Sequence, residues 1–189
     1  MKDLIINHVV LKDIYPAKAQ FYRGEKVTLV LELANESAVE QLADIHCSIW
    51  ELNLEVEKHK LTAINLLPHQ SMNLYVEAGP FETEFTGYGA EAELYLEGSS
   101  VHAMSTAFDV VSDWRQAPRY GFLSDFGAEE AGDSEDIRWM AKLHLNLVQF
   151  YDWMYRHDKL VSDEDLYTDL MGRKISRSVV SEKIAHCHD

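Results

Sequence analysis

Apolar and polar residues alternate with a period of two along the first 111 residues. In residues 25–35 (EKVTLVLELAN), Val27, Leu29, Leu31 and Leu33 fall on one face and polar residues on the other. Because successive side chains of a strand point to opposite faces of a sheet, this pattern predicts a strand with one buried face. The alternation recurs in four further stretches, at residues 44–52, 71–79, 89–98 and 101–111.

Turn-forming residues separate these stretches. Gly, Pro, Asn or Ser occurs in each of the segments 22–25, 34–37, 68–70, 79–80 and 98–100. Seven or eight short strands in about 110 residues predict an antiparallel β-sandwich of immunoglobulin type. Tyr88, at the start of a late strand, fits either the tyrosine corner of such a fold or an ordinary aromatic side chain on a sheet face.

A different pattern begins at residues 112–119, and we place a domain boundary there. The predicted domains are residues 1–112 and residues 113–189. The second domain opens with residues 112–136, a polar connector that contains Gly and several aromatic residues. Beyond this connector the alternation of period two gives way to helical spacing.

Two helices and one strand are predicted after the connector. The first helix has an acidic first turn headed by Asp133 or Ser134 as N-cap. Residues 143–151 have high β propensity, residues 163–176 read as a polar loop, and residues 176–189 read as a second amphipathic helix. The apolar positions of the helices are Ile137, Met140, Ala141 and Leu143 in the first, and Val179, Val180 and Ile184 in the second.

The order helix, buried strand, loop, helix is that of the opening of an α/β domain with parallel strands. The predicted fold class is therefore mainly β with an α/β appendage. A parallel strand needs neighbours on both edges and cover on both faces. A single βα unit is expected to dock on the sandwich, to self-associate through its unpaired strand, or to belong to a longer protein.

The chain is acidic, with 17 Lys and Arg against 32 Asp and Glu and a net charge of −15. Nucleic-acid binding is not expected, because it usually needs a basic stripe that neutralises phosphates. An anionic membrane surface is disfavoured for the same reason. The charge favours a neutral or cationic partner, or it serves solubility alone.

The two cysteines, Cys47 and Cys187, are far apart in sequence, and we expect no disulfide between them. The segment MKDLIINHVVLKD has no long apolar run, so we expect neither a signal peptide nor a transmembrane span. The expected location is cytoplasmic as the sequence reads, or secreted if a leader has been removed. We expect no cofactor.

Several other motifs have weak functional signals. The acidic loop SDEDLYTDL, residues 162–170, lacks the glycine and terminal glutamate of a calcium loop. His186, Cys187 and His188 would diverge around a helix end, so zinc is not expected. No Cys–His pair is indicated, and no glycine-rich phosphate loop has the required spacing.

Residues 148–160 (VQFYDWMYRHDKL) combine aromatic rings with hydrogen-bonding groups at the end of the predicted strand. Such residues line the substrate site at the carboxyl ends of barrel strands. Trp and Tyr rings stack on the apolar faces of a sugar, and Asp, Gln and His bind its hydroxyls. An alternative is that Phe150 and Trp153 are core residues, with Tyr151, Tyr155 and His157 in a packed polar cluster.

Three segments resemble glycoside hydrolase family 66, which contains endo-dextranases and cycloisomaltooligosaccharide glucanotransferases. They are RYGFLSDF, HLNLVQFYDWMYRHDKL and LMGRKISRSVVSEKIAHCH, at residues 119–126, 144–160 and 170–188. The resemblance covers residues 118–188 by motif and residues 1–111 by architecture. It implies an immunoglobulin-like domain followed by the first βα unit of a (β/α)8 barrel.

The resemblance also implies activity on α-1,6-linked glucan by a retaining mechanism, which uses two carboxyl groups about 5–5.5 Å apart. In the family these groups lie on later barrel strands, so no catalytic residue is assigned here, and this chain is expected to be inactive alone. The alternative is a non-catalytic glucan-binding or scaffold module. The residues that resemble the floor of the glucan site are Gln149, Tyr151, Asp152, Trp153 and His157.

Overall fold

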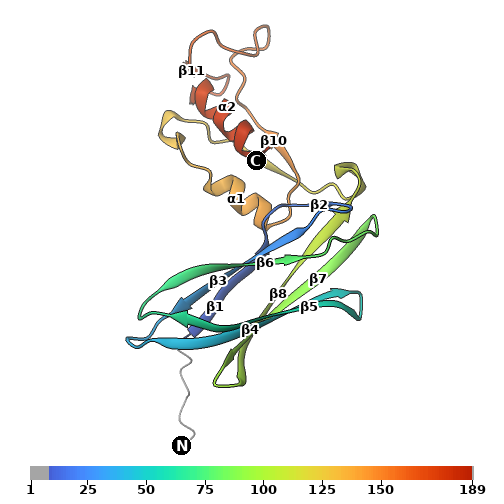
Figure 1. Cartoon of the computed structure of the whole chain (residues 1–189). Helices are drawn as coiled ribbons and strands as arrows, with labels where there is room; N and C mark the ends of the chain where they lie inside the picture. Colours follow the sequence, from blue (N-terminus) through green and yellow to red (C-terminus); the bar gives the residue numbers. More distant parts are fainter. Residues whose placement is uncertain (1–8, 189) are drawn as a thin grey trace, which may run out of the picture. The chain divides into compact units, whose positions relative to one another are not determined.

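The computed structural model describes residues 9–188, which form a mainly β structure (Figure 1). The chain divides into two compact units, residues 1–117 and residues 118–189. In the described part of unit 1 the strands are β1 Val9–Pro16, β2 Phe21–Tyr22, β3 Val27–Asn35, β4 Gln41–Glu51, β5 Leu54–Leu66, β6 Ser71–Ala78, β7 Thr86–Leu96 and β8 Ser99–Val111, followed by the 3₁₀ helix η1 Trp114–Gln116.

The strands of unit 1 form two sheets that share one core. One sheet has the order β1-β3-β6, and the other has the order β2-β8-β7-β4-β5. All pairings are antiparallel except β2 with β8, which is parallel. The inner faces of both sheets contribute to a single cluster of buried apolar residues. Unit 1 is therefore two layers of sheet around one apolar core.

The predicted strands of unit 1 are confirmed, and so is the face that each one buries. Val27, Leu29, Leu31 and Leu33 are all buried in β3. Ile45, Cys47 and Ile49 of β4 are buried too, as are the apolar residues of β7 up to Leu94, whereas Leu96 is half-buried. Cys47 is fully buried in this core, and its burial raises the pKa of its thiol to about 11.

Tyr88 lies in an aromatic cluster of the core. It is buried, and its ring stacks on Phe108 with 5.3 Å between ring centroids. Phe81 lies against the same ring at 4.5 Å, and the Thr83 side chain bonds the Tyr88 hydroxyl. Tyr88 is therefore an aromatic residue of the core, and this burial is common to both interpretations.

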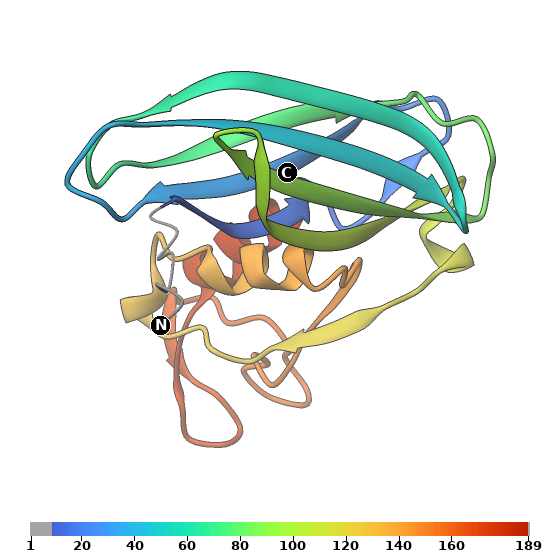
Figure 2. The same cartoon turned by 90° about the horizontal axis from the view of Figure 1, so that it is seen from below.

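Unit 2 contains a β-α-β arrangement followed by a hairpin and a helix. The elements are β9 Tyr120–Leu123, η2 Ala128–Glu130, α1 Glu135–Lys142, β10 Leu147–Phe150, β11 Leu166–Thr168, β12 Lys174–Ser176 and α2 Arg177–His186. β9 and β10 pair in parallel, and β11 and β12 pair antiparallel. In Figure 2, α1 (orange) and α2 (red) lie on the same side of β9 (yellow).

The prediction of a lone parallel strand was wrong, because the connector contains β9. Gly121 weakens the β propensity of this four-residue strand, yet it allows the helix layer to approach closely. A Cβ atom on Gly121 would lie 2.7 Å from Leu145 Cδ1 and 3.6 Å from Met140 Cε. β10 was also predicted to be buried, but its residues are alternately exposed and half-buried. β9 therefore covers one edge of β10, and in the described residues the two strands form a sheet of their own.

The predicted polar loop at residues 163–176 was also wrong, because it contains the hairpin β11–β12. Asp169 organises the turn: its Oδ1 accepts hydrogen bonds from the backbone N–H of Met171 and of Arg173. Gly172 supplies the positive φ of +83° that the turn requires. The Asp169 carboxylate therefore accepts the hydrogen bonds of backbone N–H groups in the turn, where the two strands no longer pair.

Both helices of unit 2 are confirmed. Asp133 Oδ1 accepts from the Glu135 N–H at the start of α1, while Ser134 occupies the N-cap position without a side-chain bond. Val179 and Val180 are buried in α2, as predicted. The expectation for Ile184 was wrong, because its side chain is 42% exposed.

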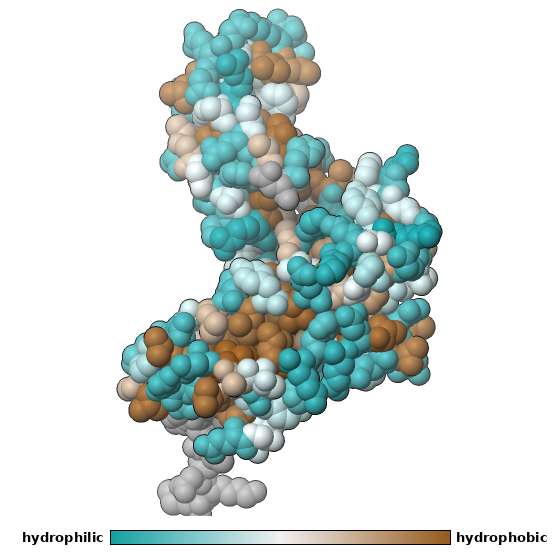
Figure 3. Space-filling view, in the orientation of Figure 1, coloured by the Kyte–Doolittle hydropathy of each residue, from teal (hydrophilic) through white to brown (hydrophobic). Residues whose placement is uncertain are grey.

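The core of unit 2 is small. Its buried residues are Leu123, Phe126, Tyr167, Ile175, Val179 and Val180. The Phe126 ring is fully buried and stacks on Phe150, with 5.4 Å between centroids. Hydrophilic residues cover most of the face seen in Figure 3, in keeping with the acidic composition. In residues 9–188, neither helix has the length and apolar content that a membrane crossing requires.

Candidate functional site

One face of the β9–β10 ladder is left open. Gly121 pairs with Val148 and Leu123 pairs with Phe150, and this face meets the core of unit 2. The alternate residues point the other way, because side chains alternate along a strand. These residues are Tyr120, Phe122, Leu147 and Gln149, and all four are exposed.

Three aromatic rings form what we call the ring surface: Tyr120, Phe122 and Tyr151. The Tyr120 and Phe122 rings meet edge to face at 5.6 Å, and the Phe122 and Tyr151 rings do so at 6.1 Å. Their exposed fractions are 61%, 54% and 49%. Tyr151 directly follows β10, and its N–H donates to the Leu123 carbonyl at 2.7 Å. The ring surface therefore reaches the carboxyl ends of both parallel strands.

The five predicted glucan-contact residues do not form one cluster. Gln149 pairs with Phe122 on the open face, and Tyr151 belongs to the ring surface. Trp153 is half-buried and packs against the core of unit 2. His157 is exposed in the loop that follows. The structure thus brings Gln149 and Tyr151 together and places the Trp153 ring elsewhere.

Asp152 occupies a turn that Arg173 stabilises. Its φ of +55° is in the left-handed region, which Asp tolerates better than most residues. The Asp152 carbonyl accepts a hydrogen bond from Arg173 Nη2, and its Oδ2 lies 3.7 Å from the same nitrogen. Arg173 is itself fixed, because its Nε donates to Asp169 Oδ2 at 2.7 Å. Arg173 therefore connects the β11–β12 turn to the end of β10.

Asp169 is expected to make unit 2 sensitive to acid. Burial raises the pKa of Asp169, but hydrogen bonds and charge from Arg173, with the Met171 N–H, lower it by more, so the net pKa is below its ordinary value. A lowered folded-state pKa means that the stabilisation is present above the unfolded pKa of about 3.9 and is lost as pH falls through the folded-state value. We expect Asp169→Asn to be less stable at pH 6 and to lose less stability on acidification. Denaturant unfolding between pH 6 and pH 2, followed by NMR signals of unit 2, measures this.

Asp125→Asn is the matched control, because Asp125 is an exposed carboxylate of the same unit. It should unfold with the same pH dependence as the unaltered chain. An Asp169→Asn variant that retained the full acid dependence would contradict the assignment.

Comparison with known proteins tests the resemblance over the same residues. The family model described as Glycosyl hydrolase family 66 matches residues 16–189, which is most of both units. The chain belongs to glycosyl hydrolase family 66. The predicted resemblance is therefore confirmed.

Other family 66 proteins resemble this chain over nearly all its length. Two cycloisomaltooligosaccharide glucanotransferases from Niallia circulans are 28% and 26% identical to it over 187 residues. The crystal structure of a Paenibacillus sp. cycloisomaltooligosaccharide glucanotransferase complexed with cycloisomaltoheptaose has a TM-score of 0.85, at 25% identity, over 94% of this chain and 26% of that chain. The match spans 95% of this chain and 19% of each Niallia relative.

Three acidic residues near the hairpin of this family 66 chain have partners within unit 2. Asp163 pairs with Lys159, and Asp165 accepts from the Ser178 N–H at the start of α2, at 2.7 Å. Asp169 binds Arg173, as described above. Across residues 9–188, the structure gathers no group of three or more His, Cys, Asp or Glu side chains suited to a metal ion.

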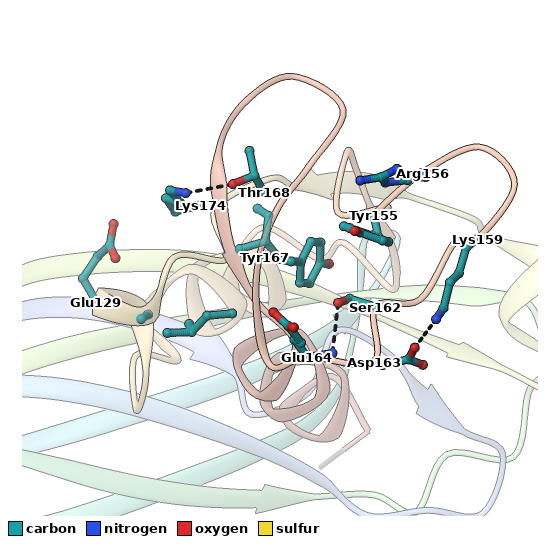
Figure 4. A pocket seen from close by; sticks show the side chains of 13 residues that line it. Glu129, Tyr155, Arg156, Lys159, Ser162, Asp163, Glu164, Tyr167, Thr168 and Lys174 are labelled. Carbon is teal, nitrogen blue, oxygen red and sulfur yellow. Dashed lines mark hydrogen bonds and ion pairs between the residues drawn. The ribbon is translucent and has the colours of Figure 1, made fainter.

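A pocket of about 720 Å³ lies beside the hairpin of the family 66 chain (Figure 4). Its walls come from η2, the loop between β10 and β11, and the two hairpin strands. The lining residues are Ala128, Glu129, Tyr155, Arg156, Lys159, Ser162, Asp163, Glu164, Leu166, Tyr167, Thr168, Lys174 and Ile175. Sequence reasoning missed it, because these residues span 128–175 and meet only through the hairpin.

Proposed function

We propose that this chain is the N-terminal portion of an enzyme that acts on α-1,6-linked glucan by a retaining mechanism. Unit 1 serves as an immunoglobulin-like scaffold domain, and unit 2 supplies the first strands of a (β/α)8 barrel. Membership of family 66 and the parallel pairing of β9 with β10 support this assignment. The Paenibacillus relative was crystallised with cycloisomaltoheptaose, which favours a glucose-based ligand.

The ring surface carries the proposal, because it is an exposed aromatic platform that runs along β9 from Tyr120 to Phe122 and continues to Tyr151 at the carboxyl end of β10. Glucose presents apolar C–H faces that stack on aromatic rings and hydroxyls that need polar partners. Tyr151 and Phe122 provide the first, and Gln149 provides an amide on the same face. Asp152 and His157 lie in the segment after the strand and are the further polar contacts that we propose.

Catalysis is not assigned to this chain. A retaining mechanism needs two carboxyl groups about 5–5.5 Å apart, one as nucleophile and the other as acid/base. The carboxylate of Asp152, at the end of β10, lies by Arg173, and its backbone is bound to that residue as well. The catalytic pair belongs to later barrel strands in this proposal, and the 189-residue chain binds glucan without cleaving it.

Affinity electrophoresis in a dextran gel tests both parts of the proposal. We expect dextran to retard the chain and expect no isomaltooligosaccharide to appear in the gel eluate. Tyr151→Ala should weaken the retardation, since it removes a ring on which the apolar face of a glucose unit would stack. Tyr75→Ala is the control, because Tyr75 is 62% exposed on β6 of unit 1.

Unretarded migration of the unaltered chain would contradict the glucan contact. Release of isomaltooligosaccharides by the purified chain would contradict the assignment of catalysis to residues outside it. Equal losses of retardation in the Tyr151 and Tyr75 variants would show that the ring surface is not the glucan contact.

A further inference from the structure

The hairpin pocket has a chemistry different from that of the ring surface. Its charges balance, with three cationic and three anionic side chains in the lining. Among the described residues, Glu129, Glu164 and Arg156 have no ion-pair partner, whereas Lys159 pairs with Asp163. Neither a strongly anionic nor a strongly cationic ligand is favoured by such a lining.

Hydroxyl groups and rings complete the lining. Ser162 and Thr168 contribute hydroxyls that are already bonded: the buried Ser162 Oγ accepts from the Glu164 N–H at 3.1 Å, and Thr168 Oγ1 accepts from Lys174 Nζ at 2.8 Å. Tyr155 and Tyr167 meet edge to face at 5.7 Å and form an apolar part of the wall. Figure 4 shows these two rings side by side, between Thr168 and Ser162. Arg156 lies over the Tyr155 ring at 4.8 Å and keeps its N–H donors, and the Glu129 and Glu164 carboxylates can accept, so a neutral polyhydroxy ligand can use both kinds of group.

The walls of the pocket are fixed by bonds within unit 2. Arg177 Nη1 donates to the Ser162 carbonyl at 3.0 Å, and the Tyr155 N–H donates to the Leu160 carbonyl at 2.9 Å. Tyr167 is buried, and its hydroxyl donates to the Trp153 carbonyl. A preformed wall lowers the ordering cost that a weakly bound ligand must overcome.

The same Tyr167 bond connects the pocket to the end of β10. Trp153 is two residues beyond Tyr151 of the ring surface, and Tyr155 of the pocket wall is two residues further. A short stretch of chain therefore joins an aromatic platform to a polar pocket whose charges balance. Its volume of about 720 Å³ lies within the range of about 300–1,000 Å³ typical of small-ligand sites.

We propose that the hairpin pocket binds a neutral gluco-oligosaccharide and is a second contact for the glucan chain, separate from the ring surface. The identity of the sugar rests on the proposed function. The pocket itself rests on its balanced charge, its hydroxyl and carboxylate partners and its fixed walls.

NMR titration of the ¹⁵N-labelled 189-residue chain with isomaltotriose tests this proposal. We expect saturable shifts of backbone amides in residues 155–175, in addition to those at residues 147–153. The double variant Glu164→Gln, Lys174→Met should bind at the pocket about tenfold more weakly, because it removes a charged acceptor and a charged donor. Glu91→Gln, on an exposed position of β7, should titrate like the unaltered chain.

The titration separates the two proposals. Shifts confined to residues 147–153 would overturn the proposal for the pocket and would leave the proposal for the ring surface intact. Shifts at residues 155–175 that the double variant does not weaken would also overturn it. A titration without shifts in either segment would overturn the proposal that the pocket binds sugar. It would also contradict the proposed glucan contact at the ring surface.

Discussion

Phe126→Ala is expected to unfold unit 2 while unit 1 stays folded. The Phe126 ring is fully buried and stacks on Phe150, within a core of few residues. Replacing a core Phe by Ala costs about 3–5 kcal/mol, whereas a small domain has a net stability near the lower end of about 5–15 kcal/mol. Two-dimensional NMR of the variant should show the dispersed signals of residues 9–117 and collapsed signals for unit 2.

Phe122→Ala is the matched control. Phe122 lies four residues earlier, but its side chain is 54% exposed on the ring surface. Its loss should change stability by no more than about 0.5 kcal/mol, as for most surface substitutions. If both variants were equally stable, the core of unit 2 would not depend on Phe126.

Asp136→Ala is expected to destabilise unit 2 by about 3 kcal/mol, because it leaves a buried ammonium without its nearer partner. Lys183 is 1% exposed, and its Nζ lies 2.6 Å from Asp136 Oδ2 and 3.4 Å from Glu130 Oε2. Lys183→Met should instead be within about 1 kcal/mol of the unaltered chain or more stable, since it removes the buried charge. Both acidic partners are partly exposed and remain hydrated in that variant. Denaturant unfolding of the two variants measures the difference.

Alkaline pH gives a second check on Lys183. Burial lowers its pKa, but hydrogen bonds and charge from Asp136 and Glu130 raise it by more, so the net pKa is above its ordinary value. The stabilisation is therefore present below the unfolded pKa of about 10.4 and is lost as pH rises through the folded-state value. Lys183→Met should lack this alkaline loss, whereas Lys26→Met, at an exposed position, should keep it. Equal destabilisation by Asp136→Ala and Lys183→Met would contradict the argument.

The sequence predicted five stretches of unit 1 well because each turns its apolar residues to the core. β5 was not singled out, because only Ile64 and Leu66 of its 13 residues are buried. Burial of the inner face imposes the alternation seen at Val27, Leu29 and Leu31, and a shift by one residue would turn all of them away from the shared core. The alternation of period two therefore indicates which residues face the core. Tyr88 could not be assigned in this way, because a buried ring on a sheet face and a tyrosine corner have the same local sequence.

Unit 2 was predicted less well because its strands are short and open on one face. β9 has four residues, and one of them is Gly121, whose role is to admit Met140 and Leu145. The hairpin depends on the Asp169 carboxylate, which replaces backbone pairing at the turn. Neither feature produces a hydrophobic period.

The candidate site was predicted only in part. Tyr151 and Gln149 follow from the aromatic and polar residues after a strand, but Tyr120 and Phe122 come from a strand that was not recognised. The positive φ of Asp152 breaks the alternation after β10 and so sends Trp153 to the core. A local turn of this kind cannot be read from residue types alone.

The pairing of β2 with β8 sets the order in which unit 1 can form during synthesis. Phe21 pairs with Val110 and Tyr22 pairs with Val111. The second strand of unit 1 therefore pairs with the last strand of that unit. Closing so long a loop costs entropy before its contacts repay it, which makes sandwiches of this kind slow to fold. On the ribosome, unit 1 can complete its five-stranded sheet only after Val111 has emerged. The local β-α-β contacts of unit 2 can then form within one short stretch of nascent chain.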